Sequence, residues 1–176
     1  HTKGNTKAEA VMLLNHQAAL DYVLNKPDYF RELTVQKNLE IHRFLTKGLG
    51  IPNKIRSGRV GITGTNYKPL AKANQIQKAL QDLCDLINSK RNVLEKAFIA
   101  LLLIAYIQPF EDGNKRTARI ICNALLLPNK YCPISFRTVE PEDYRYATLL
   151  FYEQNSIPSF KKIFMEQLEF STANYF

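Results

Sequence analysis

The chain has 176 residues, of which 45% are hydrophobic and 23% are charged. This length and composition suit one globular domain with a real core and exclude a disordered or fibrous chain. Lysine and arginine number 24 against 16 aspartate and glutamate, a net charge of +8. A basic balance favours an anionic partner: a nucleotide, a nucleic acid, an acidic protein or a membrane surface. We expect a single domain over residues 1–176, either whole or as a piece of a longer chain.

The basic residues are scattered along the chain, and no run is longer than pairs such as Lys90-Arg91 and Lys161-Lys162. Because a nucleic-acid arm or a membrane-binding patch is usually denser, this distribution argues against nucleic acid as a partner. The longest apolar run, residues 97–107, is too short to cross a bilayer. We therefore expect no membrane partner.

The three cysteines, Cys84, Cys122 and Cys132, have no spacing typical of a metal site. Cys84 and Cys122 lie in apolar helical patterns, which predicts reduced thiols in the core. Reduced thiols favour a reducing compartment, so we expect a cytoplasmic protein.

The first part of the chain has the pattern of two helices followed by an irregular segment. Apolar residues at helical spacing predict helices over residues 7–25 and 29–47, which end at Lys26-Pro27-Asp28 and at residues 48–52. Residues 54–69 combine β-branched residues and glycines without a helical stripe. This pattern predicts a short β-hairpin or an extended flap.

Five more helices are predicted in the rest of the chain, over residues 72–89, 93–107, 114–127, 140–154 and 159–173, with Pro128, Pro133 and Pro158 between them. The helix over residues 93–107 is apolar on nearly every face, so we expect it to be the central, buried helix. The expected fold class is all-α, with about seven helices and one short β-hairpin.

The segment from Ile107 to Arg119 joins this buried helix to the next one. Pro109 stops the first helix, and Gly113 permits a tight backbone. Asn114 is expected to cap the second helix through its side chain. The free N–H groups and the dipole at the start of that helix favour an anion.

Cations and a carboxylate surround this predicted anion site. Lys115 and Arg116 lie in the first turn, and Arg119 follows Arg116 on the same face. Because cations oppose the dipole at the start of a helix, three of them there indicate a bound anion. Asp112 adds the carboxylate that Mg²⁺ bridging phosphates requires. The sequence therefore predicts a polyphosphate–Mg²⁺ site, against the simpler interpretation of a capping loop with solvated basic residues.

The same segment resembles the motif of the Fic/Doc family, His-x-Phe-x-(Asp/Glu)-Gly-Asn-(Gly/Lys)-Arg-x-x-Arg, at every position except the first, where Gln108 stands. Residues 59–69 are similar to the flap of that family, residues 29–48 to the helix before the flap, and residues 131–134 to the stretch after the motif helix. The resemblance implies a Fic fold and transfer of AMP from ATP to a protein hydroxyl of Ser, Thr or Tyr.

The resemblance also implies roles for individual residues. Asp112 would hold Mg²⁺, and Phe110 would anchor the loop in the core. Backbone N–H groups of Gly113, Asn114 and Lys115 would bind the phosphates of ATP. Arg116 would contact the phosphates through its side chain, and Arg119 would bind the γ-phosphate. The flap would place the target hydroxyl through Val60, Gly61, Ile62, Thr63, Gly64 and Tyr67. The catalytic positions would be Gln108, Asp112 and Arg116.

Gln108 departs from the family motif because an amide is not basic near neutral pH and cannot act as a general base. Three explanations compete: an engineered substitution, a natural member that binds nucleotide without turning it over, and altered chemistry with another base. None of His1, His16 and His42 can be placed at the site from the sequence, which ranks the third explanation lowest. The first two stay open.

Lys3 is a second departure, if Lys3-Gly4-Asn5-Thr6 corresponds to the Glu-Gly-Asn-Thr of the inhibitory helix found in many Fic proteins. A lysine there would repel Arg119, so the inhibition would be absent. The alternative is that Lys3 belongs to an unrelated terminus.

Lys115 is typical of the Doc branch, which phosphorylates its target, whereas Arg119 favours AMP transfer. The expected function is a Fic-type protein adenylyltransferase impaired by Gln108. The alternatives are a Fic-fold pseudoenzyme that serves as a nucleotide-binding interaction module, and a Doc-like phosphotransferase.

Overall fold

The computed structural model describes residues 6–175, which form seven α-helices and two short 3₁₀-helices. The α-helices are α1 Thr6–Leu24, α2 Val35–Thr46, α3 Ala73–Ser89, α4 Val93–Ile107, α5 Asn114–Leu126, α6 Pro141–Gln154 and α7 Pro158–Tyr175. The 3₁₀-helices are η1 Pro27–Arg31 and η2 Leu127–Asn129. The predicted all-α class with seven helices is confirmed.

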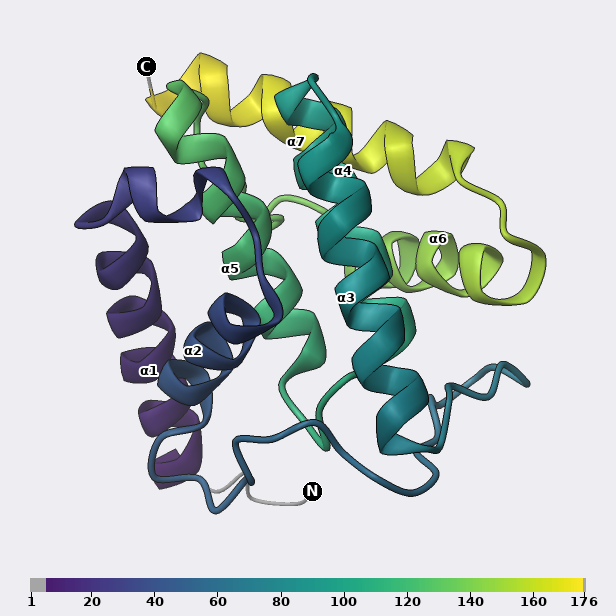
Figure 1. Ribbon diagram of the computed structural model, residues 1–176. Coiled ribbons are helices and arrows are strands. Elements are labelled where there is room, and N and C mark those ends of the chain that lie inside the picture. Colours follow the sequence, from purple (N-terminus) through teal and green to yellow (C-terminus); the bar gives the residue numbers. More distant parts are fainter. Residues whose placement is uncertain (1–5, 176) are drawn as a thin grey trace.

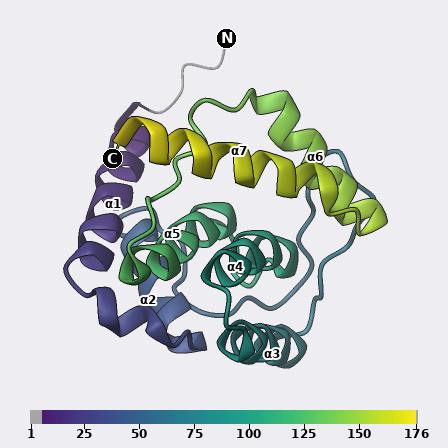
Figure 2. The same ribbon diagram turned by 90° about the horizontal axis from the view of Figure 1, so that it is seen from above.

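Helices α4 and α5 form the centre of the molecule. Seen from above, the other five helices surround this pair, with α7 crossing over one side of it (Figure 2). The chain leaves α4 and enters α5 at the same end of the molecule, and the long connection between α2 and α3 runs across that end (Figure 1). The motif segment therefore lies between a buried helical pair and this connection.

The central position of α4 follows from its sequence. Asn92 caps the helix, since its side-chain oxygen accepts hydrogen bonds from the N–H groups of Leu94 and Glu95 at 2.9 and 3.1 Å. From there to Ile107 nearly every residue is apolar, so the helix has several faces to bury. The prediction of a central, buried helix over residues 93–107 is confirmed.

The helix predicted over residues 29–47 is wrong at its start. Pro27 opens the separate 3₁₀-helix η1, and α2 begins only at Val35. The reason is a local cap: the Thr34 hydroxyl accepts a hydrogen bond from the Lys37 N–H at 3.2 Å while Thr34 itself is extended. This boundary sets the rotation of α2 and hence the direction of His42.

Helix α1 packs against α2 and also closes its carboxyl end. The buried side chain of Asn15 donates hydrogen bonds to the carbonyl oxygens of Leu45 and Lys47, at 3.2 and 2.8 Å. These carbonyls belong to the last turn and have no partner within the helix. The contact therefore fixes α2 beside the motif segment.

The predicted β-hairpin is not formed. Residues 59–69 are irregular, with a turn at Thr63 and Gly64, and no strand occurs anywhere in residues 6–175. A hairpin needs a ladder of backbone hydrogen bonds between its two arms. Here the segment is instead held by side chains of α4 and α6, and the predicted hairpin is wrong.

The cysteine prediction agrees with the fold, because Cys84, Cys122 and Cys132 are all buried and free. Burial raises the pKa of the Cys84 thiol to about 12, so the thiol stays protonated. No helix of the described residues is long and apolar enough to cross a bilayer.

Candidate functional site

The carboxyl end of α4 is closed by side chains from distant parts of the chain. Gln108 follows the helix in a left-handed conformation with φ of 52°, and its side-chain amide donates to the Ala105 carbonyl at 2.6 Å. The hydroxyl of Tyr152 donates to the same carbonyl at 3.0 Å, and that of Tyr67 donates to the Tyr106 carbonyl at 2.9 Å. Burial raises the pKa of both tyrosines, so both remain donors.

Arg56, a residue that is only 1% exposed, completes this closure. Its Nε donates to the Gln108 carbonyl at 2.6 Å, its Nη1 to the Gly58 carbonyl at 2.8 Å, and its Nη2 to the Ile107 carbonyl at 3.4 Å. One buried cation thus joins the end of α4 to the base of the flap. Burying a charge is tolerated here because carbonyl oxygens surround it.

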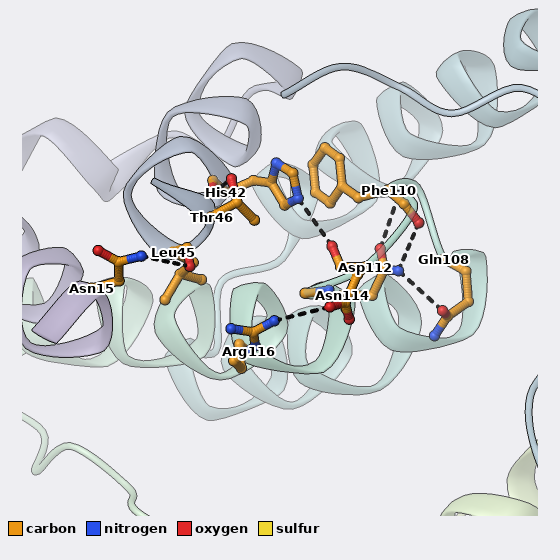
Figure 3. Close-up of polar contacts among 10 residues, drawn as sticks. Asn15, His42, Leu45, Thr46, Gln108, Phe110, Asp112, Asn114 and Arg116 are labelled. Atoms are coloured by element: carbon orange, nitrogen blue, oxygen red, sulfur yellow. Dashed lines mark hydrogen bonds and ion pairs between the residues drawn. The ribbon is translucent and has the colours of Figure 1, made fainter. Parts of the chain in front are cut away.

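The motif loop is fixed from below by an aromatic stack and a histidine. Phe110 is fully buried, and its ring stacks on that of His42 with centroids 3.8 Å apart. The Nε2 of His42 donates to the Asp112 carbonyl at 3.0 Å, since that oxygen can only accept. The Nδ1 of His42 lies 2.9 Å from the side-chain oxygen of Asn53. Figure 3 shows His42 reaching the loop from α2. Both ring nitrogens are engaged, so His42 supports the loop and offers no free base.

Asn114 does not cap α5, contrary to the sequence prediction. The cap residue is Gly113, with φ of 82°, and it has no side chain to offer. Asn114 is the first helical residue, and its side chain turns back into the loop (Figure 3). There it accepts from the Phe110 N–H at 2.9 Å and donates to the Phe110 carbonyl at 2.9 Å and to the Gln108 side-chain oxygen at 3.0 Å. The first turn of α5 is therefore left uncapped, which keeps its N–H groups available to an anion.

A pocket of about 410 Å³ lies in front of this uncapped turn. It is lined by the flap and by the motif loop, through Gly61, Ile62, Gln108, Glu111, Asp112, Gly113, Asn114, Lys115 and Arg116. The Asp112 carboxylate accepts from the Gly113 N–H at 2.6 Å and contacts the Arg116 guanidinium at 3.3 Å. Its side chain is 68% exposed, so one face of the carboxylate is open to the pocket.

The two motif arginines have hydrogen-bonding capacity that the protein leaves unused. Among the residues that the structure describes, Nη1 of Arg116 and Nε of Arg119 are buried and lack a hydrogen-bond partner. An unpaired buried donor on a cation is costly, and an anion would satisfy it. Burial, and then the charges of Arg119 and Arg145, lower the pKa of the Lys115 ammonium. Positive charge is therefore concentrated along the first turns of α5, with only the Asp112 carboxylate paired to it through Arg116.

Arg119 is separated from the pocket in front of α5. Its guanidinium lies 5.5 Å from the ring centre of Phe136 and 5.0 Å from that of Tyr144. It lines a second pocket, of about 350 Å³, whose other residues are His16, Leu20, Asn123, Pro133, Ile134, Ser135, Arg137 and Tyr175. The structure thus brings together Gln108, Asp112, Gly113, Asn114, Lys115 and Arg116, and places Arg119 one turn beyond them.

His16 lies in this second pocket and should make stability depend on pH. Burial, followed by the charges of Arg119 and Arg116, lowers the pKa of His16 below its usual value of 6.5. The unfolded chain therefore binds the proton first, and stability that is complete above about pH 6.5 falls as the pH drops toward the folded-state pKa. We expect the free energy of unfolding to fall more between pH 7 and pH 5 in this chain than in a His16→Gln variant. Urea unfolding at both pH values measures this, and equal decreases in the two proteins would contradict it.

The flap residues of the sequence prediction divide into two groups. Gly61 and Ile62 line the pocket in front of α5. Thr63 lines an adjoining pocket of about 300 Å³ with Ile62, Lys115, Arg145, Thr148, Leu149 and Tyr152. Val60, Gly64 and Tyr67 line neither pocket. The predicted inhibitory position Lys3 lies outside the described residues.

Sequence reasoning missed several residues that build the site. Arg56 stands in a segment without periodicity, and nothing in a single sequence indicates that it is buried. His42 lies on the apolar stripe of its helix, which places it inside the fold but does not indicate its contact with Asp112. The bond from the Tyr152 hydroxyl to the Ala105 carbonyl depends on how α6 packs against α4, which no local pattern indicates.

Comparison with known proteins finds a family model and similar sequences. The model described as the Fic/DOC family matches residues 32–126, more than half of the chain. Protein adenylyltransferase fic-1 of Caenorhabditis elegans is 25% identical over 151 residues, which cover 82% of this chain and 29% of that protein. Protein adenylyltransferase Fic of Nematostella vectensis is 30% identical over 119 residues, covering 64% of this chain and 27% of that protein. The chain therefore spans less than a third of the length of these relatives.

Solved structures share the fold at lower identity. Fic-1 of Caenorhabditis elegans matches with a TM-score of 0.82 and 21% identity, over 99% of this chain and 53% of that one. The BepC protein of Bartonella tribocorum with bound AMPPNP matches with a TM-score of 0.64 and 17% identity, over 87% and 85%. IbpAFic2 in complex with adenylylated Cdc42 matches with a TM-score of 0.68 and 18% identity, over 95% and 57%. The motif, the all-helical fold and the family match agree, and the chain belongs to the Fic/DOC family.

Proposed function

We propose that this chain carries the Fic domain of a protein adenylyltransferase, which binds ATP with Mg²⁺ and transfers AMP to a Ser, Thr or Tyr hydroxyl of a protein. The observation that carries the proposal is the uncapped start of α5, facing a pocket lined by Asp112, Lys115 and Arg116. The relatives named protein adenylyltransferase support the reaction, and the match to BepC with AMPPNP supports the nucleotide. We propose that residues 1–176 form one Fic domain of a longer protein, active in the cytoplasm.

The nucleotide phosphates would lie against the first turn of α5. The N–H groups of Asn114 and Lys115 and the positive end of the helix dipole favour them there, whereas the Gly113 N–H already donates to the Asp112 carboxylate. Arg116 would contact them through its unpaired Nη1. Arg119 lines the second pocket, so holding the γ-phosphate would require the nucleotide to extend past the first turn of α5 toward that side chain. Binding would satisfy the buried Nη1 of Arg116 with a charged acceptor, which a neutral ligand would do less well.

Asp112 fits a magnesium ion that is shared with phosphates. The described residues contain no group of three acidic, histidine or cysteine side chains that could hold a metal by themselves. Mg²⁺ in nucleotide sites is usually held by one or two carboxylates together with phosphates and water, and Asp112 offers one exposed carboxylate at the correct end of α5. When bound, the ion would neutralise phosphate charge.

Gln108 explains why transfer would be weak. Its amide is occupied at both ends, because the nitrogen donates to the Ala105 carbonyl and the oxygen accepts from Asn114. It holds the loop closed, and it cannot take a proton from an attacking hydroxyl. Positioning by the flap and charge neutralisation would remain, without a general base.

The same contacts support a second candidate function, a pseudoenzyme that binds nucleotide and serves as an interaction module. In that case Gln108 is a structural residue only, and the pocket holds ATP without turnover. A Doc-like phosphotransferase is a third candidate, which Lys115 favours because that branch carries lysine at the same position.

Labelled ATP distinguishes the three functions. The chain and a Gln108→His variant are incubated with Mg²⁺ and with ATP labelled at either the α- or the γ-phosphate, and label on the protein is recorded with ATP affinity. For AMP transfer we expect α-label on the histidine form only. Label from the γ-position would indicate phosphotransfer, and ATP binding without any label would indicate the pseudoenzyme. Asp143, an exposed residue on α6, serves as the control for Asp112. If Asp112→Asn abolishes labelling and Asp143→Asn does not, the reaction takes place at the proposed site.

If neither form binds ATP, the proposal that α5 begins a nucleotide site fails. Calorimetry of Mg²⁺–ATP binding gives this result independently of the labelling.

A further inference from the structure

The flap, residues 59–69, is open along its backbone. Within the described part of the chain, none of its residues makes a backbone-to-backbone hydrogen bond. Its base is closed just outside, where the Gly58 N–H donates to the Ala71 carbonyl at 2.8 Å. A segment with free backbone N–H and C=O groups can pair with a partner strand. Because it has no backbone hydrogen bonds of its own, other contacts must fix its position.

Helix α6 supplies contacts that hold one point of the flap. The Glu153 carboxylate accepts hydrogen bonds from the Thr65 hydroxyl and from the Asn66 N–H, the second at 2.5 Å. The Thr65 oxygen in turn accepts from the Tyr67 N–H at 3.0 Å. These bonds, that from Thr65 first, lower the pKa of Glu153, so the carboxylate is charged at neutral pH.

Two further contacts show how closely the flap follows α4 and α6. The ring of Tyr67 stacks on Tyr106 with centroids 4.2 Å apart. Gly64 has φ of 89°, and a Cβ there would come within 2.8 Å of the Arg145 guanidinium. The turn of the flap therefore lies against α6, and the left-handed backbone at Gly64 favours glycine there.

We propose that Glu153 is a positioning residue that tethers the flap to α6 and so sets where its free backbone edge lies over the pocket. Gly61 and Ile62, which line that pocket with Gln108, stand only three to five residues before the tethered Thr65 and Asn66. Glu153 itself lines no part of this pocket and acts only through the flap. The consequence for an acceptor rests on the proposed function, whereas the tether itself does not.

An exposed glutamate on a helix is usually solvated, and its contacts contribute little to the stability of the fold. Glu153 differs because it gathers two donors from one flap segment 87 and 88 residues away, and one of them is a backbone N–H. Removing it therefore frees a main-chain group of the flap itself, which a solvated surface residue would not do.

Amide exchange in the free protein tests the tether without any ligand. In Glu153→Ala we expect the Asn66 and Tyr67 amides, followed by NMR, to exchange roughly fivefold faster or more, while the amides of α4 and α5 are unchanged. Glu153→Gln keeps one accepting oxygen, so its exchange rates should lie between those of the unchanged protein and those of Glu153→Ala. Glu142→Ala, an exposed glutamate on the same helix, is the control. Exchange in Glu153→Ala equal to that of the control would overturn the proposal.

A kinetic measurement then tests the positioning role. In a Gln108→His background, Glu153→Ala should slow self-labelling from Mg²⁺–ATP several-fold at saturating ATP, with unchanged ATP affinity, and Thr65→Val should add little further loss because it breaks the same contact. Faster exchange with an unchanged labelling rate would show a tether without a positioning role and would refute that role. If the histidine background transfers no AMP at all, the proposed function fails, and amide exchange still decides whether the tether exists.

Discussion

Replacing Gln108 with histidine is expected to raise the rate of AMP transfer by roughly 10²–10⁴-fold, the usual contribution of a general base. The imidazole would accept the proton of the attacking hydroxyl, which the present amide cannot do. The left-handed conformation at this position is one that histidine adopts more readily than most residues. The rate is measured as AMP incorporated per unit time at saturating Mg²⁺–ATP.

The same substitution should cost some stability, because the amide bonds to the Ala105 carbonyl and to Asn114 are lost. We expect a decrease of about 1 kcal/mol in the free energy of unfolding. Gln108→Leu loses the same bonds and adds no base, so it separates the two effects. If AMP transfer by Gln108→His is no faster than by Gln108→Leu, the side chain at position 108 does not accept the proton of the attacking hydroxyl.

Replacing Arg56 with methionine is expected to lower the free energy of unfolding by about 3 kcal/mol, because three carbonyl oxygens lose a charged donor. Methionine fills much of the volume, so the loss reports the hydrogen bonds more than a cavity. Denaturant unfolding with an unchanged m-value measures it.

Arg59→Met is the matched control for Arg56. Arg59 lies three residues later and is exposed, so we expect a change within about 0.5 kcal/mol. Equal destabilisation by the two substitutions would mean that Arg56 does not hold the end of α4. Release of this end should also weaken Mg²⁺–ATP binding in Arg56→Met, since the motif loop begins there.

The parts of the fold that depend on neighbouring residues could be predicted from the sequence. Helix α4 begins and ends where it was predicted, because Asn92 caps it and Pro109 stops it locally. The residues from Asp112 to Arg116 surround one pocket because they are consecutive at the start of a helix. The start of α2 was missed although its signal, Thr34, is also local.

The parts that depend on distant contacts could not be predicted. The prediction of a hairpin was wrong because the flap is held by Glu153 of α6 and by Tyr106 of α4. No pattern within residues 59–69 reveals these contacts. Asn114 has the residue type of a helix cap, yet Gly113 takes that position and leaves Asn114 to bind Phe110. A resemblance identifies the motif, but only packing shows that Arg119 lies over the neighbouring rings of Phe136 and Tyr144.

The buried Arg56 also has an electrostatic consequence for the loop between the central helices. The carboxyl end of α4, with its partial negative charge, and the amino end of α5, with its partial positive charge, meet within six residues. Without another charge nearby, the electric fields of the two helix ends would largely cancel at an anion placed between them. Arg56 neutralises the α4 end from inside the protein, where salt screens it little, and the field of α5 is left unopposed. Arg56, which lines no part of the pocket in front of α5, thus strengthens the preference of this loop for negative charge.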